Sequence, residues 1–114
     1  MTHSELVTNL VKPGAHIAKE ITPNQAHLLH MVFGISGEAG ELLDAVKKHV
    51  IYRKDLDTHN VVEEIGDLLF YIEGLCQAIG VTMETAKLLN IKKLQKRYGE
   101  KYSDKAAIER VDKQ

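Results

Sequence analysis

The chain has 114 residues, which is enough for one ordinary domain with a modest hydrophobic core. Its 15 basic and 16 acidic residues give a net charge of −1, so no overall field favours binding to nucleic acid or to an acidic membrane surface. The single cysteine, Cys76, excludes an internal disulfide and is typical of a reducing cytoplasm.

Targeting signals are not recognisable in the sequence. The uninterrupted apolar runs are too short to span a bilayer, and no long apolar segment follows residues 1–5, as it would in a signal peptide. We therefore expect a cytoplasmic protein with neither a membrane nor a nucleic acid as its partner.

The first quarter of the chain contains both prolines, Pro13 and Pro23. Ahead of them a short helix is predicted over residues 4–11, with Ser4 as its cap. The sequence Lys12-Pro13-Gly14 then ends that helix with residues typical of a turn.

A long helix is predicted from Thr22 to about Ile51. Thr22 is the expected cap, Pro23 suits the first helical position, and Gln25 completes a capping box. Apolar residues then recur four and three positions apart, at Leu28, Val32, Ile35, Ala39, Leu42 and Val46. This stripe indicates one buried helix face.

Asp57 or Thr58 is expected to begin a second long helix, which ends at Gly80. Its apolar residues repeat with high regularity, at Val61, Ile65, Leu68, Ile72, Leu75 and Ile79. This pattern again predicts a buried face.

A third long helix is predicted from a cap at Thr82 to about Tyr98, with Gly99 ending it. A short helix over residues 105–111, capped by Ser103-Asp104, is expected after it. Short connections between long helices favour antiparallel neighbours. The prediction is one all-α domain over residues 1–114, built like an antiparallel four-helix bundle.

Two pairs of carboxylates are the most informative feature of the sequence. Glu38 and Glu41 are three residues apart in one predicted helix, and Glu64 and Asp67 are three apart in the next. Like charges at this spacing repel and reduce helix stability. On a helical wheel both pairs border the apolar face, so all four can converge between two helices. We therefore expect a bound cation.

Carboxylate oxygens suit a hard cation, so Mg²⁺ is expected, with Mn²⁺ as a substitute. Carboxylate-bound Mg²⁺ usually keeps positions for water and phosphate oxygens, which favours phosphoryl or pyrophosphoryl transfer. A phosphate-binding face is available on the last long helix, at Asn90, Lys93, Arg97 and Tyr98. The alternative interpretation is a solvated basic helix end that complements the helix dipole.

Glycines recur near the carboxylates, at Gly34, Gly37 and Gly40 in one helix and at Gly66 inside the second acidic pair. Each costs about 1 kcal/mol relative to alanine in a helix interior. Glycine at these positions indicates close approach of another backbone or of a ligand.

The carboxylate pairs resemble the signature of the MazG-like all-α nucleoside triphosphate pyrophosphohydrolases, Glu-x-x-Glu followed by Glu-x-x-Asp. Here the pairs lie within GEAGELLDAVKK and EEIGDLLFY, and the later NIKKLQKRY is also similar to the family. The resemblance covers about residues 24–103 and implies a four-helix fold of MazG type.

The resemblance implies hydrolysis of a nucleoside triphosphate to the monophosphate and pyrophosphate. It implies that Mg²⁺ is held by Glu38, Glu41, Glu64 and Asp67, and that Glu38 or Glu41 orients or deprotonates the attacking water. Contacts to the substrate are implied for Tyr71, Asn90, Lys93, Arg97 and Tyr98. The family is usually dimeric or tetrameric, with the active site near the subunit interface, so a homodimer or homotetramer is expected.

The chain departs from those relatives that stack a pyrimidine base on tryptophan, because it has none. His27 and His30, upstream of Glu38, are candidates for lining the base pocket instead. Taken alone, each also fits an ordinary polar position on a helix border. Phe70, opposite the apolar face of its helix, is a candidate for a subunit contact.

Two other functions remain open from the sequence. The same carboxylates fit a non-catalytic helical module that binds nucleotide or metal and acts as a regulator. Phosphoribosyl-ATP pyrophosphohydrolase, an enzyme of the same architecture, is the other alternative.

Overall fold

A computed structural model describes residues 1–99, 101–110 and 112, and all regular structure in this part of the chain is helical. This confirms the all-α prediction. The helices, in chain order, are α1 (His3–Leu10), α2 (Gly14–Glu20), α3 (Pro23–Val50), α4 (Thr58–Ile79), α5 (Met83–Tyr98) and α6 (Asp104–Glu109).

The starts of the three long helices follow the predicted capping residues. The Thr22 hydroxyl accepts a hydrogen bond from the Gln25 backbone N–H at 3.1 Å, and the Gln25 side-chain oxygen accepts one from the Thr22 backbone N–H at 2.9 Å. Asp57 caps α4 and Thr82 caps α5, each by accepting a hydrogen bond from the backbone N–H three residues later. Gly80 ends α4 in the left-handed conformation, at φ 75°, which glycine adopts readily.

The short helices depart from the prediction. Thr2, rather than Ser4, caps α1 through a capping box with Glu5. Helix α2 was not predicted, because its seven residues are too few to establish a periodic pattern. Helix α6 is capped by Ser103, as predicted, but ends at Glu109. Val111, the predicted end of this helix, lies outside the described residues.

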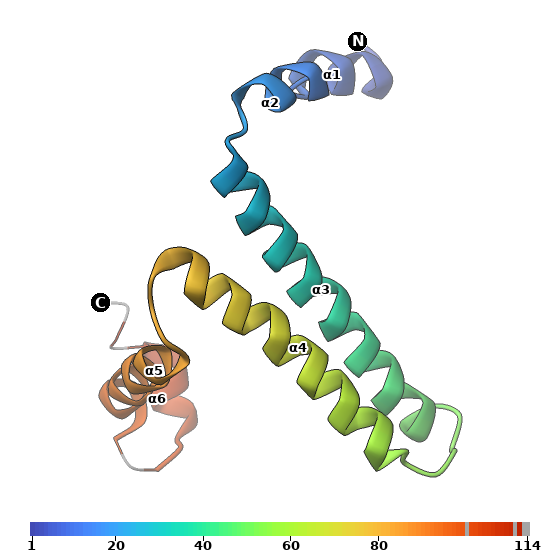
Figure 1. Cartoon of the computed structure of the whole chain (residues 1–114). Coiled ribbons are helices and arrows are strands. Elements are labelled where there is room, and N and C mark those ends of the chain that lie inside the picture. Colours follow the sequence, from blue (N-terminus) through green and yellow to red (C-terminus); the bar gives the residue numbers. More distant parts are fainter. Residues whose placement is uncertain (100, 111, 113–114) are drawn as a thin grey trace.

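Helices α3 and α4 form an antiparallel hairpin joined by residues 51–57 (Figure 1). Two glycines set how closely the helices approach. The Tyr71 ring lies against Gly34, where an added Cβ would be 2.2 Å from Tyr71 Cδ1. Met31 lies against Gly74, where an added Cβ would be 2.3 Å from the Met31 sulfur. The close approach expected at Gly34 is therefore present, and Gly74 is a second instance.

Replacing Gly34 by alanine is expected to lower the free energy of unfolding by about 1–3 kcal/mol, because the new methyl group overlaps the Tyr71 ring. Gly37→Ala is the matched control, since nothing lies within 4 Å of a Cβ at that position. The control should be neutral or stabilise α3 by up to about 1 kcal/mol. Urea unfolding at one fixed protein concentration measures both. Equal stability of the two variants would contradict this packing of the hairpin.

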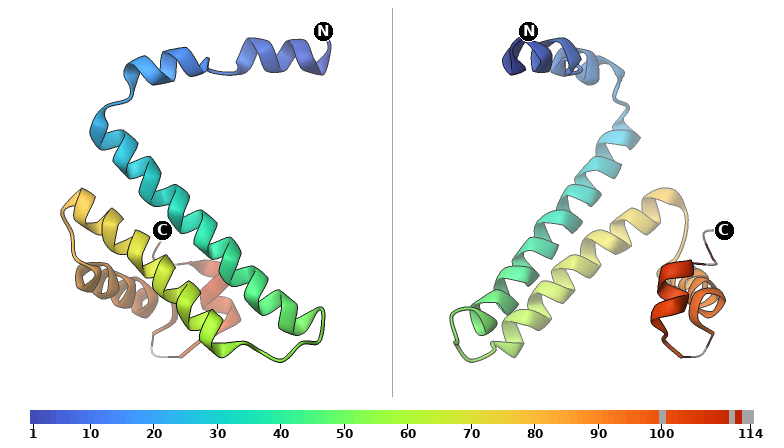
Figure 2. Two further views of the ribbon diagram at one scale, coloured as in Figure 1. Left: turned by 45° about the vertical axis from the view of Figure 1, so that its right-hand side comes forward. Right: turned by 180° about the vertical axis from the view of Figure 1, so that it is seen from behind.

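The other helices do not complete a four-helix bundle within the described part of the chain. Helix α5 leaves α4 at an angle of 95° and packs against α6 beyond α4, on the side away from α3 (Figures 1 and 2). Helices α1 and α2 form an arm that projects from the start of α3 (Figure 2). Among the described residues, the α3–α4 hairpin is therefore the main helix–helix packing unit.

The described residues bury very little apolar surface. Only Met31, Ala45 and Cys76 are buried, and none of the residues of the two predicted apolar faces is among them. The exposed area is 9257 Å², whereas a compact chain of this size would expose about 6,300 Å². The radius of gyration is 19.8 Å, against about 13 Å for a compact domain. The apolar faces are therefore open to another protein surface.

Within the described residues, no single helix has the length and apolar character needed to cross a membrane. Helices α4 and α5 meet that test only when taken together across their 95° bend.

Candidate functional site

Three of the four predicted carboxylates meet at the seam between α3 and α4. Glu38 on α3 and Glu64 and Asp67 on α4 each place one carboxylate oxygen within 4.8 Å of the other two. Glu64, Asp67 and Tyr71 are three and four residues apart on α4, so they share the face that meets α3. The contact of Tyr71 with Gly34 holds this face against α3, one turn from Glu38.

The polar borders of the two helices take part in the seam between them. Met31, Gly34 and Glu38 lie on the α4 side of α3, whereas Val32 and Val46 of the predicted stripe remain 40% exposed. The predicted apolar faces are therefore only partly buried in the hairpin, where Ile35, Leu42, Leu68 and Ile72 are half-buried. Glu38 and Glu64 are half-buried at this seam, and Asp67 is exposed at its edge.

The electrostatics of the cluster favour a cation. Partial burial raises the pKa of Glu64, and Glu38, through hydrogen bonding and then its negative charge, raises it further. Asp67 and Glu41 add smaller repulsions that act in the same direction. The donors are all oxygens and their charges repel, so the residues present fit a hard divalent cation such as Mg²⁺.

Replacing Glu64 by glutamine is expected to stabilise the metal-free protein. The pKa of Glu64 is raised in the folded state, so stability is greatest when this group is protonated and falls as the pH rises through the folded pKa. Glutamine cannot ionise, so the variant does not lose this stability as the pH rises. In thermal unfolding with EDTA, the variant should melt a few degrees above the wild type near pH 8 and equal it near pH 4.

The same melting experiment is repeated with Mg²⁺ in place of EDTA. Mg²⁺ should raise the melting temperature of the wild type far more than that of Glu64→Gln. A variant less stable than the wild type near pH 8 in EDTA would contradict repulsion at the cluster.

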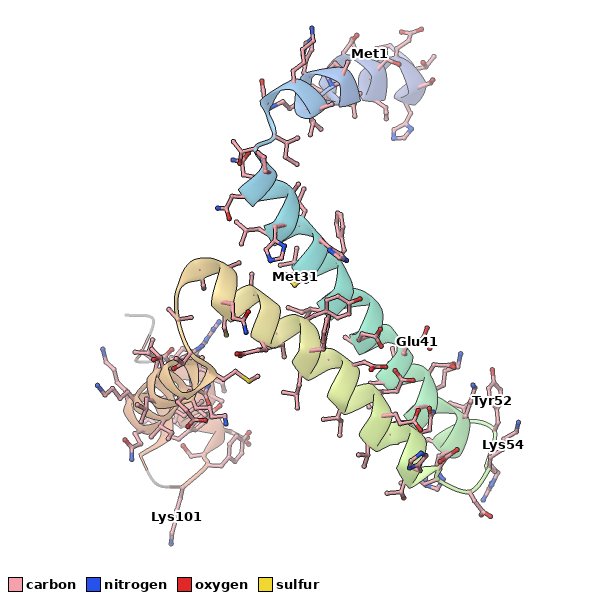
Figure 3. All side chains as sticks on the ribbon, in the orientation of Figure 1. Met1, Met31, Glu41, Tyr52, Lys54 and Lys101 are labelled. Atoms are coloured by element: carbon pink, nitrogen blue, oxygen red, sulfur yellow. The ribbon has the colours of Figure 1, made fainter. Side chains whose placement is uncertain are left out.

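Glu41 lies outside the group of three. It is exposed, one turn further along α3 towards the closed end of the hairpin (Figure 3). Its charge still contributes to the raised pKa of Glu64. The structure therefore separates the predicted set into three converging carboxylates and one peripheral carboxylate.

Aromatic side chains continue the site beyond the carboxylates. The rings of Phe70 and Tyr71 on α4 are nearly perpendicular, with their centroids 5.1 Å apart. The ring of His30 on α3 has its centroid 6.1 Å from that of Tyr71. A hollow of about 320 Å³ is lined by Glu38, Asp67, Phe70 and Tyr71. Tyr71 therefore lies directly beside the carboxylates.

A second hollow, of about 300 Å³, also has Phe70 in its wall; its other lining residues are His27, Met31, Glu73, Gly74 and Gln77. Of the two predicted histidines, only His27 lines it. Glu73 and Gln77 were not recognised from the sequence. Their spacing from Phe70, three and seven residues, places all three on one helix face and is the signal that could have identified them.

The predicted phosphate-binding residues are elsewhere in the chain. Helix α5 carries Asn90, Lys93, Arg97 and Tyr98 in the unit that it forms with α6. Lys101, in the loop between α5 and α6, and Glu41 lie on opposite sides of α4 in Figure 3. Within one chain, the basic face and the carboxylates do not form a common site.

Arg97 is engaged inside the α5–α6 unit. Its Nε and Nη2 donate hydrogen bonds to the two carboxylate oxygens of Asp112, at 2.8 and 3.2 Å. This pairing raises the pKa of Arg97 and lowers that of Asp112. Asn90 and Tyr98 line a separate hollow with Tyr102.

Comparison with known proteins identifies a family. The family profile described as the MazG nucleotide pyrophosphohydrolase domain matches residues 26–101. The chain is also similar to the Gene 37 protein of Mycobacterium phage L5, with 33% identity over 76 residues, covering 61% of this chain and 65% of that protein. The chain thus spans slightly less than two thirds of this relative. No solved structure gives a significant match.

Proposed function

Because the chain belongs to the MazG nucleotide pyrophosphohydrolase family, we propose that it hydrolyses a nucleoside triphosphate to the monophosphate and pyrophosphate, with Mg²⁺ as its cofactor and Mn²⁺ as a substitute. The observation that carries this proposal is the meeting of Glu38, Glu64 and Asp67 within 4.8 Å between two helices. The family uses divalent metals, and this oxygen-only cluster is suited to one.

In the proposed reaction, a water oxygen bonds to the α-phosphorus, the bond from that phosphorus to the bridging oxygen breaks, and pyrophosphate leaves. Glu38 or Glu41 accepts the proton of the water. The bound cation would neutralise charge on the phosphate oxygens. Tyr71, fixed against Gly34, would border the nucleotide on the side away from the hairpin turn.

A homo-oligomer is part of this proposal. Each chain exposes about 3,000 Å² more than a compact chain of its size would. A standard interface buries about 800 Å² per partner, and obligate ones bury considerably more. Val62, Ile65 and Leu69 form an exposed apolar row on α4, three and four residues apart, that is suited to such an interface.

Assembly would also complete the site. Since the basic face of α5 is apart from the carboxylates of its own chain, we propose that Asn90, Lys93, Arg97 and Tyr98 of one chain contact phosphates held at the carboxylates of another. A cytoplasmic location belongs to the same proposal and is supported by Cys76, a buried free thiol.

The test is a panel of ribo- and deoxyribonucleoside triphosphates incubated with the protein and Mg²⁺, with pyrophosphate and monophosphate quantified. Phosphoribosyl-ATP belongs in the same panel, because preferential turnover of it would identify the related enzyme instead. No pyrophosphate from any substrate would refute the proposed activity.

A non-catalytic nucleotide- or metal-binding regulator is the second candidate. It is favoured by the pairing of Arg97 with Asp112, which engages a predicted phosphate ligand within the chain. Nucleotide binding in calorimetry without any product in the panel would identify this function.

A further inference from the structure

We propose that the hollow between Phe70 and His27 binds the nucleobase and selects bases that carry an exocyclic amino group. This inference rests on the proposed function, because it places the base relative to phosphates held at the carboxylates.

The hollow lies next to the carboxylate site. Phe70 lines both this hollow and the neighbouring one that contains Glu38 and Asp67. Along α4, Phe70 and Gly74 lie about 4.5 and 10 Å beyond Asp67, at a rise of 1.5 Å per residue. A nucleotide with its phosphates at the carboxylates therefore extends its sugar and base one to two helical turns, into the hollow.

The walls suit a flat ring. The Phe70 ring is 68% exposed although it is apolar, so one of its faces is available for stacking. The floor is Met31, which is buried against Gly74 and leaves no room there for a larger residue. The imidazole of His27 lines the same hollow. Stacking on such walls holds any base, so it contributes affinity rather than selectivity.

Selectivity comes from two polar side chains in this hollow. The Gln77 amide nitrogen donates a hydrogen bond to the Glu73 carboxylate at 3.2 Å. Because an ionised carboxylate only accepts, the amide must present its nitrogen to Glu73. The Gln77 carbonyl oxygen and the second Glu73 oxygen are then left as acceptors. Acceptors pair with the amino group of cytosine or adenine and repel the carbonyl oxygen that uracil or hypoxanthine has at the same place.

The discriminating experiment compares kcat/KM for CTP against UTP and for ATP against ITP, two pairs that differ only in the exocyclic group and in the proton on the ring nitrogen beside it. The wild type should prefer the amino member of each pair by at least about fivefold. Glu73→Gln should bring both ratios close to one, since an amide can also donate to a carbonyl oxygen.

Phe70→Ala tests the stacking wall. It should raise KM at least about tenfold for all four nucleotides. The inhibition constant of inorganic tripolyphosphate, which has no base, should not change. Phe33→Ala is the matched control, because Phe33 is also 68% exposed and lies outside both hollows. It should leave KM and the inhibition constant as in the wild type.

Two results would overturn the inference while leaving the proposed function intact. One is turnover without preference between the pair members in the wild type. The other is a change of oligomeric state in Phe70→Ala by light scattering, which would assign Phe70 to a subunit interface. If no nucleotide is turned over, the proposed activity fails. Calorimetric binding of CTP and UTP with Mg²⁺ then tests the base site by itself, and equal affinities would overturn it.

Discussion

Asp67→Asn is expected to reduce pyrophosphate release by about 1,000-fold or more, because a carboxylate that binds a metal contributes several kcal/mol to stabilising transition-state charge. Asparagine has nearly the same shape, and Asp67 is exposed at one edge of the carboxylate cluster. The variant should therefore keep its helical circular dichroism spectrum and its oligomeric state. Initial rates at saturating Mg²⁺ and substrate measure the effect.

Asp44→Asn is the matched control for this experiment. Asp44 is an acidic residue of α3 that forms an ion pair with Lys48 at 3.0 Å and is not part of the carboxylate cluster. Its replacement removes the same charge and should leave turnover within about twofold of the wild type.

Glu41→Gln is expected to abolish turnover as well, because the family signature includes this residue. Glu41 lies outside the group of three carboxylates, so comparing Glu41→Gln with Asp67→Asn tests whether the site needs the fourth carboxylate. Loss of activity in Asp67→Asn alone would reduce the site to the three carboxylates that meet in the structure. Full activity in both variants would contradict the assigned site.

The sequence predicts the long helices well because the signals that begin and end them are local. Thr22, Asp57 and Thr82 each accept a hydrogen bond from a backbone amide three residues later, and Gly80 takes the left-handed conformation that follows a helix. These contacts depend only on near neighbours in the chain. Helix α2 has Pro13 at its start and no side-chain cap, so it lacks the capping residue by which the start of a helix is predicted.

The relative arrangement of the helices could not be predicted in the same way. An apolar stripe shows that a helix face is buried but not against which protein surface. The stripe of α3 predicts a buried face, whereas Glu38 and Gly34 face α4 and the stripe is left partly exposed. Glycine is similarly ambiguous, since Gly34 packs against Tyr71 while an added Cβ at Gly40 or Gly66 would meet nothing within 4 Å.

In the candidate site, too, local spacing predicts some features, whereas others depend on contacts between distant parts of the chain. The spacing of Glu38, Glu64 and Asp67 predicts that carboxylates converge between two helices, because residues three apart share a face. The hollow beyond Phe70 depends on which residue of α3 lies opposite Gly74, and this register is not encoded by any local pattern. Arg97 pairs with Asp112, fifteen residues further along the chain, and no local pattern predicts this contact.

Leu69→Lys is expected to dissociate the proposed oligomer, with the dissociation constant raised at least about 100-fold. Leu69 is 44% exposed in the chain, so a lysine there would be well tolerated in a monomer. In an assembly that buries the row of Val62, Ile65 and Leu69, the same lysine would place an unpaired charge in an apolar interface. Sedimentation equilibrium and concentration-dependent thermal unfolding measure the change.

Ile108→Lys is the control for this substitution. Ile108 is an apolar residue of α6 with 81% exposure, so the same change of charge there should leave the assembly intact. A Leu69→Lys protein with the mass and melting temperature of the wild type would show that this row is not an interface.

Mixing variants then separates the role of the interface in assembly from its role in the site. Asp67→Asn removes a carboxylate ligand and Arg97→Ala removes a proposed phosphate contact, so neither homo-oligomer should be active. If each site takes its carboxylates from one chain and its Arg97 from another, a dimer with one chain of each kind contains one intact site. Equal amounts of the two variants, unfolded and refolded together, should recover roughly a quarter of wild-type activity. No recovery, with hybrid dimers present by mass spectrometry, would mean that Arg97 does not act across the interface.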